Sequence, residues 1–429
     1  MLSAMQKNWY RLDTAALIFP AITRSNWSNA FRFSVTLHEE IDPYTLQHAL
    51  DDLRPRFPSF FLSLHKGFFW YYLEDIEEPI RVQEDFAYPL TFMRQKELKK
   101  HCLRVLYYKN RIAVEIFHSL TDGHGGSIFI ANLTRRYLEI RHGITIPAEG
   151  AIYDLAGTPT AEELEDSFLK YAAPAAASRN DPPAYHLQGT PEDNGFRHLT
   201  TGIVDTGSLI EAAHTYKVSV TAFLSAVMAE SIIRIQDEKT PKKRQKPVKV
   251  TIPVDMRRLF GSGTLRNFVL AINPGVEPKF GDYTLAELCQ NISHQLAIGA
   301  TRQNMAGMIA ANVEPQRITA IRLAPVFIKN PIMDLIYQSS GENPGSISIS
   351  NITKIDLPEA MLPYMERMEF IIGPQRSYPN NCSVISFDGK TYINMIRNIR
   401  ESELERLFFS RLVELGIPVD IESNDASIR

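Results

Sequence analysis

A histidine and an acidic residue stand close together in the stretch "FHSLTDGHGG", which runs from Phe117 to Gly126. His118 is followed four residues later by Asp122 and then by Gly123. An imidazole with an ordinary pKa near 6.5 can take up a proton at neutral pH, as a general base does. The carboxylate could orient that imidazole, or it could pair with an arginine and brace the turn. The glycines would permit a tight backbone, including positive φ angles.

Three interpretations of this stretch remain open from the residues alone. Chance places an HxxxDG pattern in a chain of this composition only about 0.03 times, so the pattern has a cause. His118 is then either a catalytic base or a structural histidine in a turn. The third interpretation, a metal site formed by His118, Asp122 and His124, is disfavoured because no further ligand cluster accompanies them. We therefore predict no metal.

The surrounding sequence predicts that the stretch is a turn between a strand and a helix. Residues 102–108 and 111–117 are rich in strand-forming side chains and are separated by Lys109 and Asn110, which is typical of a hairpin. From Ser127 onward the apolar residues follow helical spacing until Gly143, a typical C-terminal stop. His118 is thus expected at the end of a strand, facing a cleft.

The rest of the chain predicts helices mixed with antiparallel hairpins in both halves, an α+β pattern. A segment at 172–197, dense in Pro, Gly, Ala and Asn, is the candidate crossover between them. We predict an N-terminal lobe at 1–175 and a C-terminal lobe at 176–429. The expected helices are 45–57, 220–236, 285–301 and a last one with a capping box of Ser402 and Glu405. The expected strands and hairpins are 60–73 around Lys66-Gly67, 248–252, 345–352 and 383–396 around Asp388-Gly389.

Composition and charge exclude several classes of protein. The 429 residues suffice for two or three domains. Lys and Arg number 46 against 49 Asp and Glu, a net charge of −3, so no global basic field attracts nucleic acid or an anionic membrane. Cys102, Cys289 and Cys382 lack metal-binding spacing and suit a reducing compartment. The opening is too polar for a secretory signal, and the most apolar run, 218–233, is interrupted by polar residues. We expect a cytoplasmic protein without a transmembrane segment.

The HxxxDG pattern followed by a further glycine pair resembles the chloramphenicol acetyltransferase-like superfamily. That group includes plant BAHD acyltransferases, nonribosomal peptide condensation domains and bacterial alcohol acetyltransferase-like proteins. The resemblance extends over most of the chain and is closest to the stand-alone alcohol acetyltransferase-like branch. The similar blocks, in matching order, are 10–21 "YRLDTAALIFPA", 56–73 "RFPSFFLSLHKGFFWYYL", 250–268 "VTIPVDMRRLFGSGTLRNF" and 348–352 "SISNI".

The resemblance implies a fold and a set of residue roles. It implies two similar lobes, each a mixed sheet flanked by helices, with the active site at their interface in a tunnel open at both ends. His118 would be the general base, within a catalytic motif that includes Asp122 and Gly123. Asp122 would pair with Arg257, and Ser350 is a possible oxyanion donor. Ser350 is equally explained as a solvent-side strand serine.

The same resemblance implies an acyl-CoA-dependent O-acyltransferase that carries an acyl group from a thioester to an alcohol. No permanently bound cofactor and no covalent acyl-enzyme are implied. The alternatives are a carrier-protein-dependent acyltransferase or condensation-type enzyme, with a carrier protein as partner, and a non-catalytic scaffold of the same fold.

Two departures bear on these alternatives. Condensation domains usually have a second histidine where this chain has Phe117, and no carrier domain is visible. The DFGWG motif of the plant family is absent, which leaves the coenzyme A contacts unassigned. The basic run at 242–249 could meet a coenzyme A phosphate, although a solvated loop explains it better.

Overall fold

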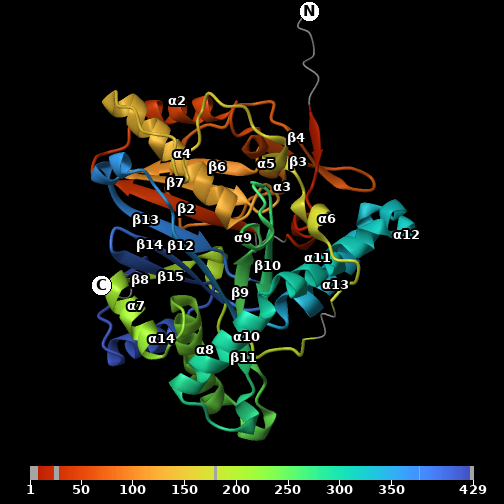
Figure 1. Cartoon of the computed structure of the whole chain (residues 1–429), viewed down its shortest axis with the longest axis vertical. Coiled ribbons are helices and arrows are strands. Elements are labelled where there is room, and N and C mark those ends of the chain that lie inside the picture. Colours follow the sequence, from red (N-terminus) through yellow and green to blue (C-terminus); the bar gives the residue numbers. More distant parts are fainter. Residues whose placement is uncertain (1–7, 24–28, 178–180, 376, 426–429) are drawn as a thin grey trace, which may run out of the picture.

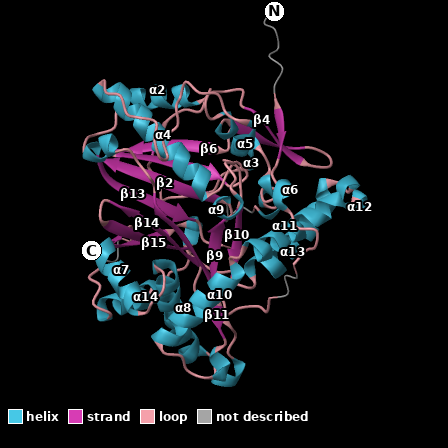
Figure 2. Cartoon of the chain, in the orientation of Figure 1, coloured by secondary structure: helices cyan, strands magenta, loops and turns pink. Residues whose placement is uncertain are grey.

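Figure 1 shows a computed structural model that describes residues 8–23, 29–177, 181–375 and 377–425. Residues 1–7 of the opening and 178–180 of the predicted crossover lie outside the described residues. Two large sheets lie side by side in the middle of the molecule, with helices on their outer sides (Figure 2). The predicted class, two mixed sheets flanked by helices, is confirmed.

The first large sheet contains the strand that leads into His118. Its five strands, in spatial order, are β13 (Met365–Ile372), β2 (Ala30–Leu37), β7 (Arg111–Phe117), β6 (Leu103–Tyr108) and β5 (Gln83–Glu84). β6 and β7 form the predicted hairpin, with Lys109 at a φ of 51° in the turn. β13 comes from the second half of the chain and pairs antiparallel with β2. The division at 175/176 stays a prediction, and one strand of this sheet comes from beyond it.

The second large sheet is built entirely from the second half of the chain. In spatial order it contains β10 (Val269–Ile272), β9 (Val248–Asp255), β12 (Ile347–Lys354), β14 (Asn380–Phe387), β15 (Lys390–Arg397), β8 (His198–Asp205) and β16 (Asp420–Ser423), with β11 (Gly275–Val276) also beside β9. β12 runs parallel to both β9 and β14, and the other pairs are antiparallel. The sheet is therefore mixed.

Side chains of the second sheet bind the backbone of the first. Ser383 Oγ on β14 donates to the Phe370 carbonyl on β13 at 2.6 Å, and Asn394 Nδ2 on β15 donates to the same oxygen at 3.1 Å. These three residues are buried. The buried Phe370 carbonyl thus accepts two hydrogen bonds from the second sheet, and these bonds fix the position of the β13 edge of the first sheet against the second sheet.

A small third sheet and the helices complete the fold. The third sheet orders β1 (Trp9–Arg11), β4 (Tyr71–Asp75) and β3 (Leu62–Lys66), all antiparallel. In the first half the helices are α1 (Phe19–Ile22), α2 (Pro43–Leu53), α3 (Gln95–Leu98), α4 (Gly123–His142), α5 (Ala161–Leu164) and α6 (Ser167–Tyr171). In the second half they are α7 (Thr206–Thr215), α8 (Val220–Lys239), α9 (Arg257–Phe260), α10 (Leu285–Gly299), α11 (Arg302–Arg317), α12 (Thr319–Leu323), α13 (Val326–Tyr337) and α14 (Glu403–Glu414).

The helices are divided between the two large sheets. Figure 1 shows α2 and α4 beside the first sheet, α7, α8, α10 and α14 beside the second, and α11 to α13 projecting to one side. Among the described residues no single helix is long and apolar enough to cross a membrane, although α7 and α8, bent by 77°, pass that test as a pair. The three cysteines are buried and unpaired.

The structure differs from the sequence prediction at three helix ends: α2 ends at Leu53 rather than at residue 57, α4 starts earlier than predicted, and the N-terminal cap of α14 is different. α4 begins at Gly123 rather than Ser127, because the Asp122 side chain accepts the backbone N–H groups of His124 and Gly125 and so caps the helix four residues earlier. The capping box predicted at Ser402 is wrong, since Ser402 has a φ of −97° and a ψ of 18° and its side chain caps nothing. The box forms instead at Thr284, with Glu287, at the start of α10.

The glycines after Asp122 allow close packing and do not adopt positive φ, contrary to the sequence expectation. A Cβ on Gly125 would lie 2.0 Å from Thr121 Oγ1 and 2.5 Å from the Leu265 carbonyl oxygen. A Cβ on Gly126 would lie 2.6 Å from the Phe31 ring. The backbone of the first turn of α4 therefore packs so closely against residues of both lobes that no side chain fits at these positions. Only at the far end does α4 need positive φ, at Gly143, with 63°.

Replacing Gly125 with alanine should destabilise the fold, although alanine favours helices over glycine by up to about 1 kcal/mol. The two contacts below 3 Å are to a side chain near the backbone and to a carbonyl, so the helix must shift, and overpacking of this kind costs about 1–3 kcal/mol. Urea denaturation would measure the loss. Gly263→Ala is the matched control, because its Cβ would meet nothing closer than 3.4 Å. Equal stability of the two variants would contradict close packing at Gly125.

Candidate active site

His118 sits immediately after β7, where the strand leaves the first sheet. Its backbone N–H still donates to the carbonyl of Asn29, the residue before β2, at 2.7 Å. The hydrogen bonds between β7 and β2 therefore continue as far as His118. The imidazole stacks on Phe19 with ring centroids 4.5 Å apart and meets the edge of Phe31 at 5.0 Å. These rings hold the imidazole plane in place, and His118 lines a large cavity.

Asn267, just before β10 in the second lobe, determines which nitrogen of His118 carries the proton. Asn267 Nδ2 lies 2.9 Å from the His118 carbonyl oxygen and 3.0 Å from Asp13 Oδ2. Because both partners are acceptors when Asp13 is ionised, this atom must be the amide nitrogen. Asn267 Oδ1 is then the atom that lies 2.9 Å from His118 Nδ1. An amide oxygen accepts only, so Nδ1 carries the hydrogen and Nε2 keeps its lone pair.

Asp13 anchors Asn267 from behind. It is fully buried, its Oδ1 accepts the Ala16 N–H at 2.7 Å, and Arg266 Nε lies 3.6 Å from its Oδ2. Burial raises the pKa of Asp13 to about 6, while Arg266 and Asn267 oppose that rise. The ionised carboxylate accepts the Asn267 amide, and the His118 carbonyl, which is always an acceptor, independently requires the amide nitrogen at that position. Asp13, Asn267 and His118 form a chain of hydrogen bonds that runs from the N-terminal segment through the second lobe and back.

Asp122 turns away from the imidazole and forms an ion pair across the two lobes. Arg257 Nη2 lies 3.0 Å from each Asp122 oxygen, and the Phe268 N–H donates to Oδ2 at 2.7 Å. Burial alone would raise the Asp122 pKa, but Arg257 and the Phe268 amide outweigh it and hold the pKa below its usual value. Of the two roles open from the sequence, the geometry favours bracing the turn.

Arg257 is itself fully engaged on α9. Nε donates to the Thr264 carbonyl at 2.7 Å, Nη1 to Asp255 Oδ1 at 2.9 Å and Nη2 to the Arg266 carbonyl at 2.5 Å. The guanidinium thus organises the 264–268 loop, which carries Asn267. One ion pair therefore fixes both the turn that bears His118 and the loop that orients it.

The remaining predicted residues lie around the same cavity. Gly123 lines it at the start of α4, where a Cβ would meet Ile352 at 2.9 Å. Ser350 is half-buried on β12 and lines the cavity, so the structure brings it to the same space as His118. Ser348, two residues earlier, already donates to the Thr251 carbonyl at 3.3 Å. The oxyanion role of Ser350 stays a prediction.

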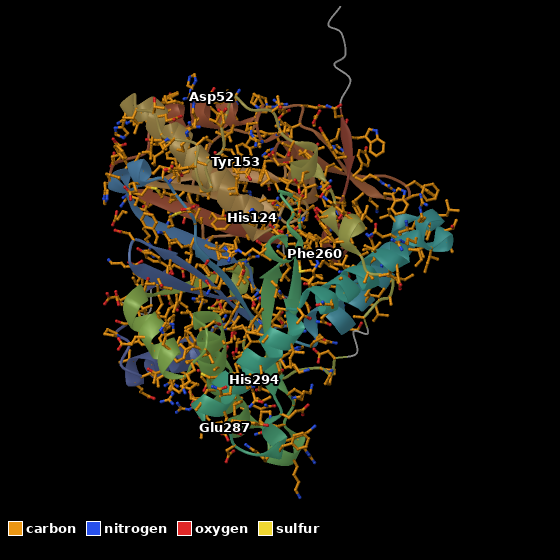
Figure 3. All side chains as sticks on the ribbon, in the orientation of Figure 1. Asp52, His124, Tyr153, Phe260, Glu287 and His294 are labelled. Atoms are coloured by element: carbon orange, nitrogen blue, oxygen red, sulfur yellow. The ribbon has the colours of Figure 1, made fainter. Side chains whose placement is uncertain are left out.

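His124, in the first turn of α4, also lines the cavity (Figure 3). Its Nδ1 is 3.9 Å from Asp255 Oδ2, and burial together with the Arg257 charge lowers its pKa. Within the described part of the chain no group of three or more His, Cys, Asp or Glu side chains gathers in metal-binding geometry. The set of His118, Asp122 and His124 does not form such a group, because Arg257 occupies the Asp122 oxygens.

The cavity is about 1290 Å³ and extends through the interface of the lobes. Its wall contains Phe19 and Phe31, whose rings contact His118, and it also contains side chains of α12 and α13. Arg258, which is exposed, also lines it. Such a volume suits a large organic molecule in a mostly apolar space with a few polar groups.

The basic run at 242–249 does not line this cavity. Lys242 pairs with Asp282 at 2.6 Å, and Lys249 pairs with Asp181. The interpretation as a solvated, internally paired loop is therefore favoured over a phosphate site.

Burial lowers the pKa of His118 below the usual value, and the Asp122 charge and the Asn267 hydrogen bond oppose that shift. The imidazole is therefore neutral at neutral pH. Together with the proton on Nδ1, this leaves a single basic nitrogen, Nε2, on a ring that faces the cavity. The arrangement can accept one proton from a bound molecule and return it.

No protein-family model matches the chain, and no curated protein sequence does. Solved structures do match over nearly the whole length. A TRI101 structure from Fusarium sporotrichioides, complexed with coenzyme A and T-2, is 14% identical, with a TM-score of 0.64, covering 96% of this chain and 99% of that one. The TRI3 trichothecene 15-O-acetyltransferase from the same organism is 12% identical, with a TM-score of 0.60, and the coverage is 97% and 96%.

The starter condensation domain of rhizomide synthetase RzmA also matches, at 14% identity and a TM-score of 0.58, covering 95% of this chain and 94% of that domain. Acetyltransferases and condensation domains therefore share this architecture. The predicted chloramphenicol acetyltransferase-like, condensation-domain-like fold is confirmed.

The sequence analysis named His118, Asp122 and Arg257 as candidate site residues and did not name Asn267 or Asp13. Asp13 and Asn267 both lie in sequence blocks that resemble the family, at 10–21 and 250–268. The resemblance therefore indicated the segments but not the two residues. Nothing in the spacing of an asparagine in one lobe and an aspartate in the other indicates that they meet at His118.

Removing either partner of the Asp122–Arg257 pair should cost about 3–5 kcal/mol of stability, because the other charge stays buried and uncompensated. The double variant Asp122→Ala/Arg257→Ala should lose less than the sum of the single losses. Since the Asp122 pKa is lowered, the stability that it supplies is present above about pH 4 and lost as the pH falls further. Urea titrations at several pH values would measure this.

The exposed pair of Lys239 and Glu403, 3.1 Å apart, is the control, and Lys239→Ala should change stability by less than about 1 kcal/mol. Strictly additive losses at Asp122 and Arg257 would show that the two side chains act independently.

Nitrogen-15 NMR of histidine-labelled protein should show His118 protonated on Nδ1, and Asn267→Ala should abolish that preference, because the acceptor that fixes the tautomer is gone. The measurement does not depend on any enzymatic activity. Asn273→Ala is the control: Asn273 Nδ2 also reaches a carboxylate, Asp181 Oδ2 at 3.4 Å, but Asn273 lies outside the cavity wall. A wild-type His118 protonated on Nε2 would refute the orientation assigned to Asn267.

Proposed function

We propose that this chain is an acyl-CoA-dependent O-acyltransferase that moves an acyl group from a thioester to an alcohol, with His118 as general base. The observation that carries the proposal is the orientation of His118: Asn267 holds the hydrogen on Nδ1, and the neutral ring lines the cavity. The matches to acetyltransferases, one of them complexed with coenzyme A and T-2, agree with this choice but extend only to the fold.

The proposed reaction needs one base and one anion stabiliser. His118 Nε2 takes the proton of the acceptor hydroxyl as its oxygen attacks the thioester carbonyl carbon. The carbonyl electrons move to oxygen, and Ser350 would donate a hydrogen bond to that oxyanion. When the oxyanion collapses the carbon–sulfur bond breaks, and the protonated His118 returns its proton to the thiolate. The products are an ester and free coenzyme A.

Asp122 and Arg257 are positioning residues in this proposal. Neither carboxylate oxygen of Asp122 contacts the imidazole, and Arg257 lies behind the 264–268 loop. We assign them the placement of the His118 turn and of Asn267. A Cβ on Gly123 would lie 2.9 Å from Cδ1 at the end of the Ile352 side chain, which can move aside, so Gly123 belongs to this proposal through the HxxxDG pattern and not through packing.

Arg258 is our candidate contact for the phosphates of the donor. It is exposed and lines the cavity next to α4, and Arg is well suited to bind phosphate. The buried, unpaired cysteines fit a reducing compartment, so a cytoplasmic location belongs to the same proposal.

Carrier-dependent transfer is the second candidate, favoured by the match to a condensation domain. Purified protein supplied with acetyl-CoA and a panel of alcohols should release free thiol, without added metal or ATP and unchanged by chelator. The same acyl group loaded on a carrier protein forms the second arm. Turnover only from the carrier would replace the first candidate, and no turnover from either donor would favour a non-catalytic scaffold.

His118→Ala should lower turnover by at least about 10²-fold while the protein stays folded, since a positioned general base contributes about 10²–10⁴. Thiol release measures the rate, and circular dichroism and the melting temperature check the fold. His294→Ala is the control, because His294 is exposed on α10 (Figure 3) and does not line the cavity. Full activity in a folded His118→Ala protein would remove this histidine from the mechanism.

A further inference from the structure

The outer surface of α12 and α13 carries an unusual density of exposed apolar side chains. Six of them are between 45% and 67% exposed, namely Leu323, Phe327, Ile328, Ile332, Leu335 and Ile336. We call this set the α12–α13 apolar face. Soluble proteins rarely expose so many neighbouring large apolar groups, and such patches mark sites of interaction.

The neighbouring β3–β4 loop extends this face. Phe68, 67% exposed, accepts the Val326 N–H at its carbonyl at 2.9 Å. Lys329 Nζ donates to the Phe69 carbonyl at 2.9 Å and lies 3.5 Å from the centre of the Trp70 ring. The loop is thus bound to α13, and its phenylalanines add to the same apolar surface.

This face is continuous with the cavity that contains His118. Ile321, Ile332 and Ile336 are exposed to solvent, and all three also line the cavity. Met333, which lies between Ile332 and Ile336 in the sequence, is half-buried and also lines the cavity. The cavity therefore opens through α12 and α13, and its mouth is apolar on both the inner and the outer side.

The charges at this end fit an anionic lipid surface. Arg317 and Arg322 are exposed at the ends of α11 and α12, next to the apolar side chains, and outnumber the exposed acidic residue of this stretch, Glu314. Figure 1 shows α12 projecting away from the two sheets, so a flat surface can reach it. Apolar side chains with basic neighbours are the composition of interfacial membrane anchors.

We propose that the α12–α13 apolar face docks on a lipid surface and that the acceptor is an amphiphilic alcohol with a long hydrocarbon part. The hydrocarbon part passes from the lipid, between Ile321, Ile332 and Ile336, into the cavity and brings the hydroxyl to His118. The water-soluble donor arrives on the Arg258 side. A protein partner seated here would close the mouth, whereas a lipid surface supplies the substrate through it. The acceptor class rests on the proposed function, but the docking does not.

The first experiment measures docking without any turnover. Vesicles of phosphatidylcholine, with and without phosphatidylglycerol, are mixed with wild-type protein and with Phe327→Ser/Leu335→Ser, and bound protein is separated by flotation. These two side chains are 65% and 67% exposed and do not line the cavity. Removing them should weaken vesicle binding by at least about tenfold, since each buries a large apolar group on insertion. Phosphatidylglycerol should strengthen wild-type binding.

The matched control is Phe86→Ser/Phe280→Ser, which removes two phenylalanines that are 88% and 77% exposed elsewhere on the molecule. It should bind vesicles as the wild type does. Equal binding of all three proteins, or of none, would overturn the proposal. So would a wild-type dimer that Phe327→Ser/Leu335→Ser dissociates, because the face would then belong to a second copy of this chain.

The second experiment separates this inference from the proposed function. Acetyl transfer to a short, water-soluble alcohol should be the same in Phe327→Ser/Leu335→Ser and wild type, whereas transfer to a long-chain alcohol held in vesicles should fall at least about tenfold. If the wild type also fails with every alcohol, the proposed function is wrong while docking stands on the flotation result. Equal loss on both alcohols would refute a role of this face in delivering the acceptor.

Discussion

The ion pair between Asp122 and Arg257 joins the two halves of the site. Two charges removed from water would be costly on their own, and the chain offsets that cost by saturating both with hydrogen bonds. Asp122 accepts from the start of α4, from the Phe268 amide and from Arg257, while Arg257 also donates to Thr264 and Arg266 carbonyls. Because these partners belong to different lobes, the pair forms completely only when the lobes are docked.

The orientation of His118 depends on that docking. The histidine comes from the end of β7, but the group that fixes its tautomer, Asn267, comes from the other lobe and is anchored by Asp13. Asp122 contributes its charge, which opposes the fall in the His118 pKa caused by burial, without touching the ring. Placement and electrostatics are thus assigned to different residues, and this explains why the acidic residue of the HxxxDG pattern faces away from the histidine.

Local signals in the sequence were reliable where local physics decides the structure. The alternating residues of β6 and β7 and the Asp388-Gly389 turn were predicted, and Asp388 and Gly389 adopt φ of 46° and 74°. Contacts distant in sequence were not: Asp13 and Asn267 are 254 residues apart. Ser402 failed as a cap because its backbone is not extended, which a pattern of residue types does not record.

The glycines and helix α13 show a second kind of limit. The glycines after Asp122 looked like turn residues, but they are needed because Thr121, Leu265 and Phe31 come within side-chain distance of the backbone. α13 escaped prediction because it is apolar on most sides, and helical periodicity is visible only when one face is polar. The apolar surface of α13, which made its helical periodicity hard to detect, also makes the mouth of the cavity apolar.

The apolar cavity and the basic histidine have a common physical origin. Removing water from around His118 disfavours the imidazolium and so keeps Nε2 unprotonated at neutral pH. In the proposed reaction, the same exclusion of water would protect the thioester from hydrolysis and would strengthen each hydrogen bond to the developing oxyanion. A hydrocarbon substrate that fills the space between α13 and His118 would complete this exclusion. The acceptor would then do more than receive the acyl group, because its chain would displace the water that competes with its own hydroxyl.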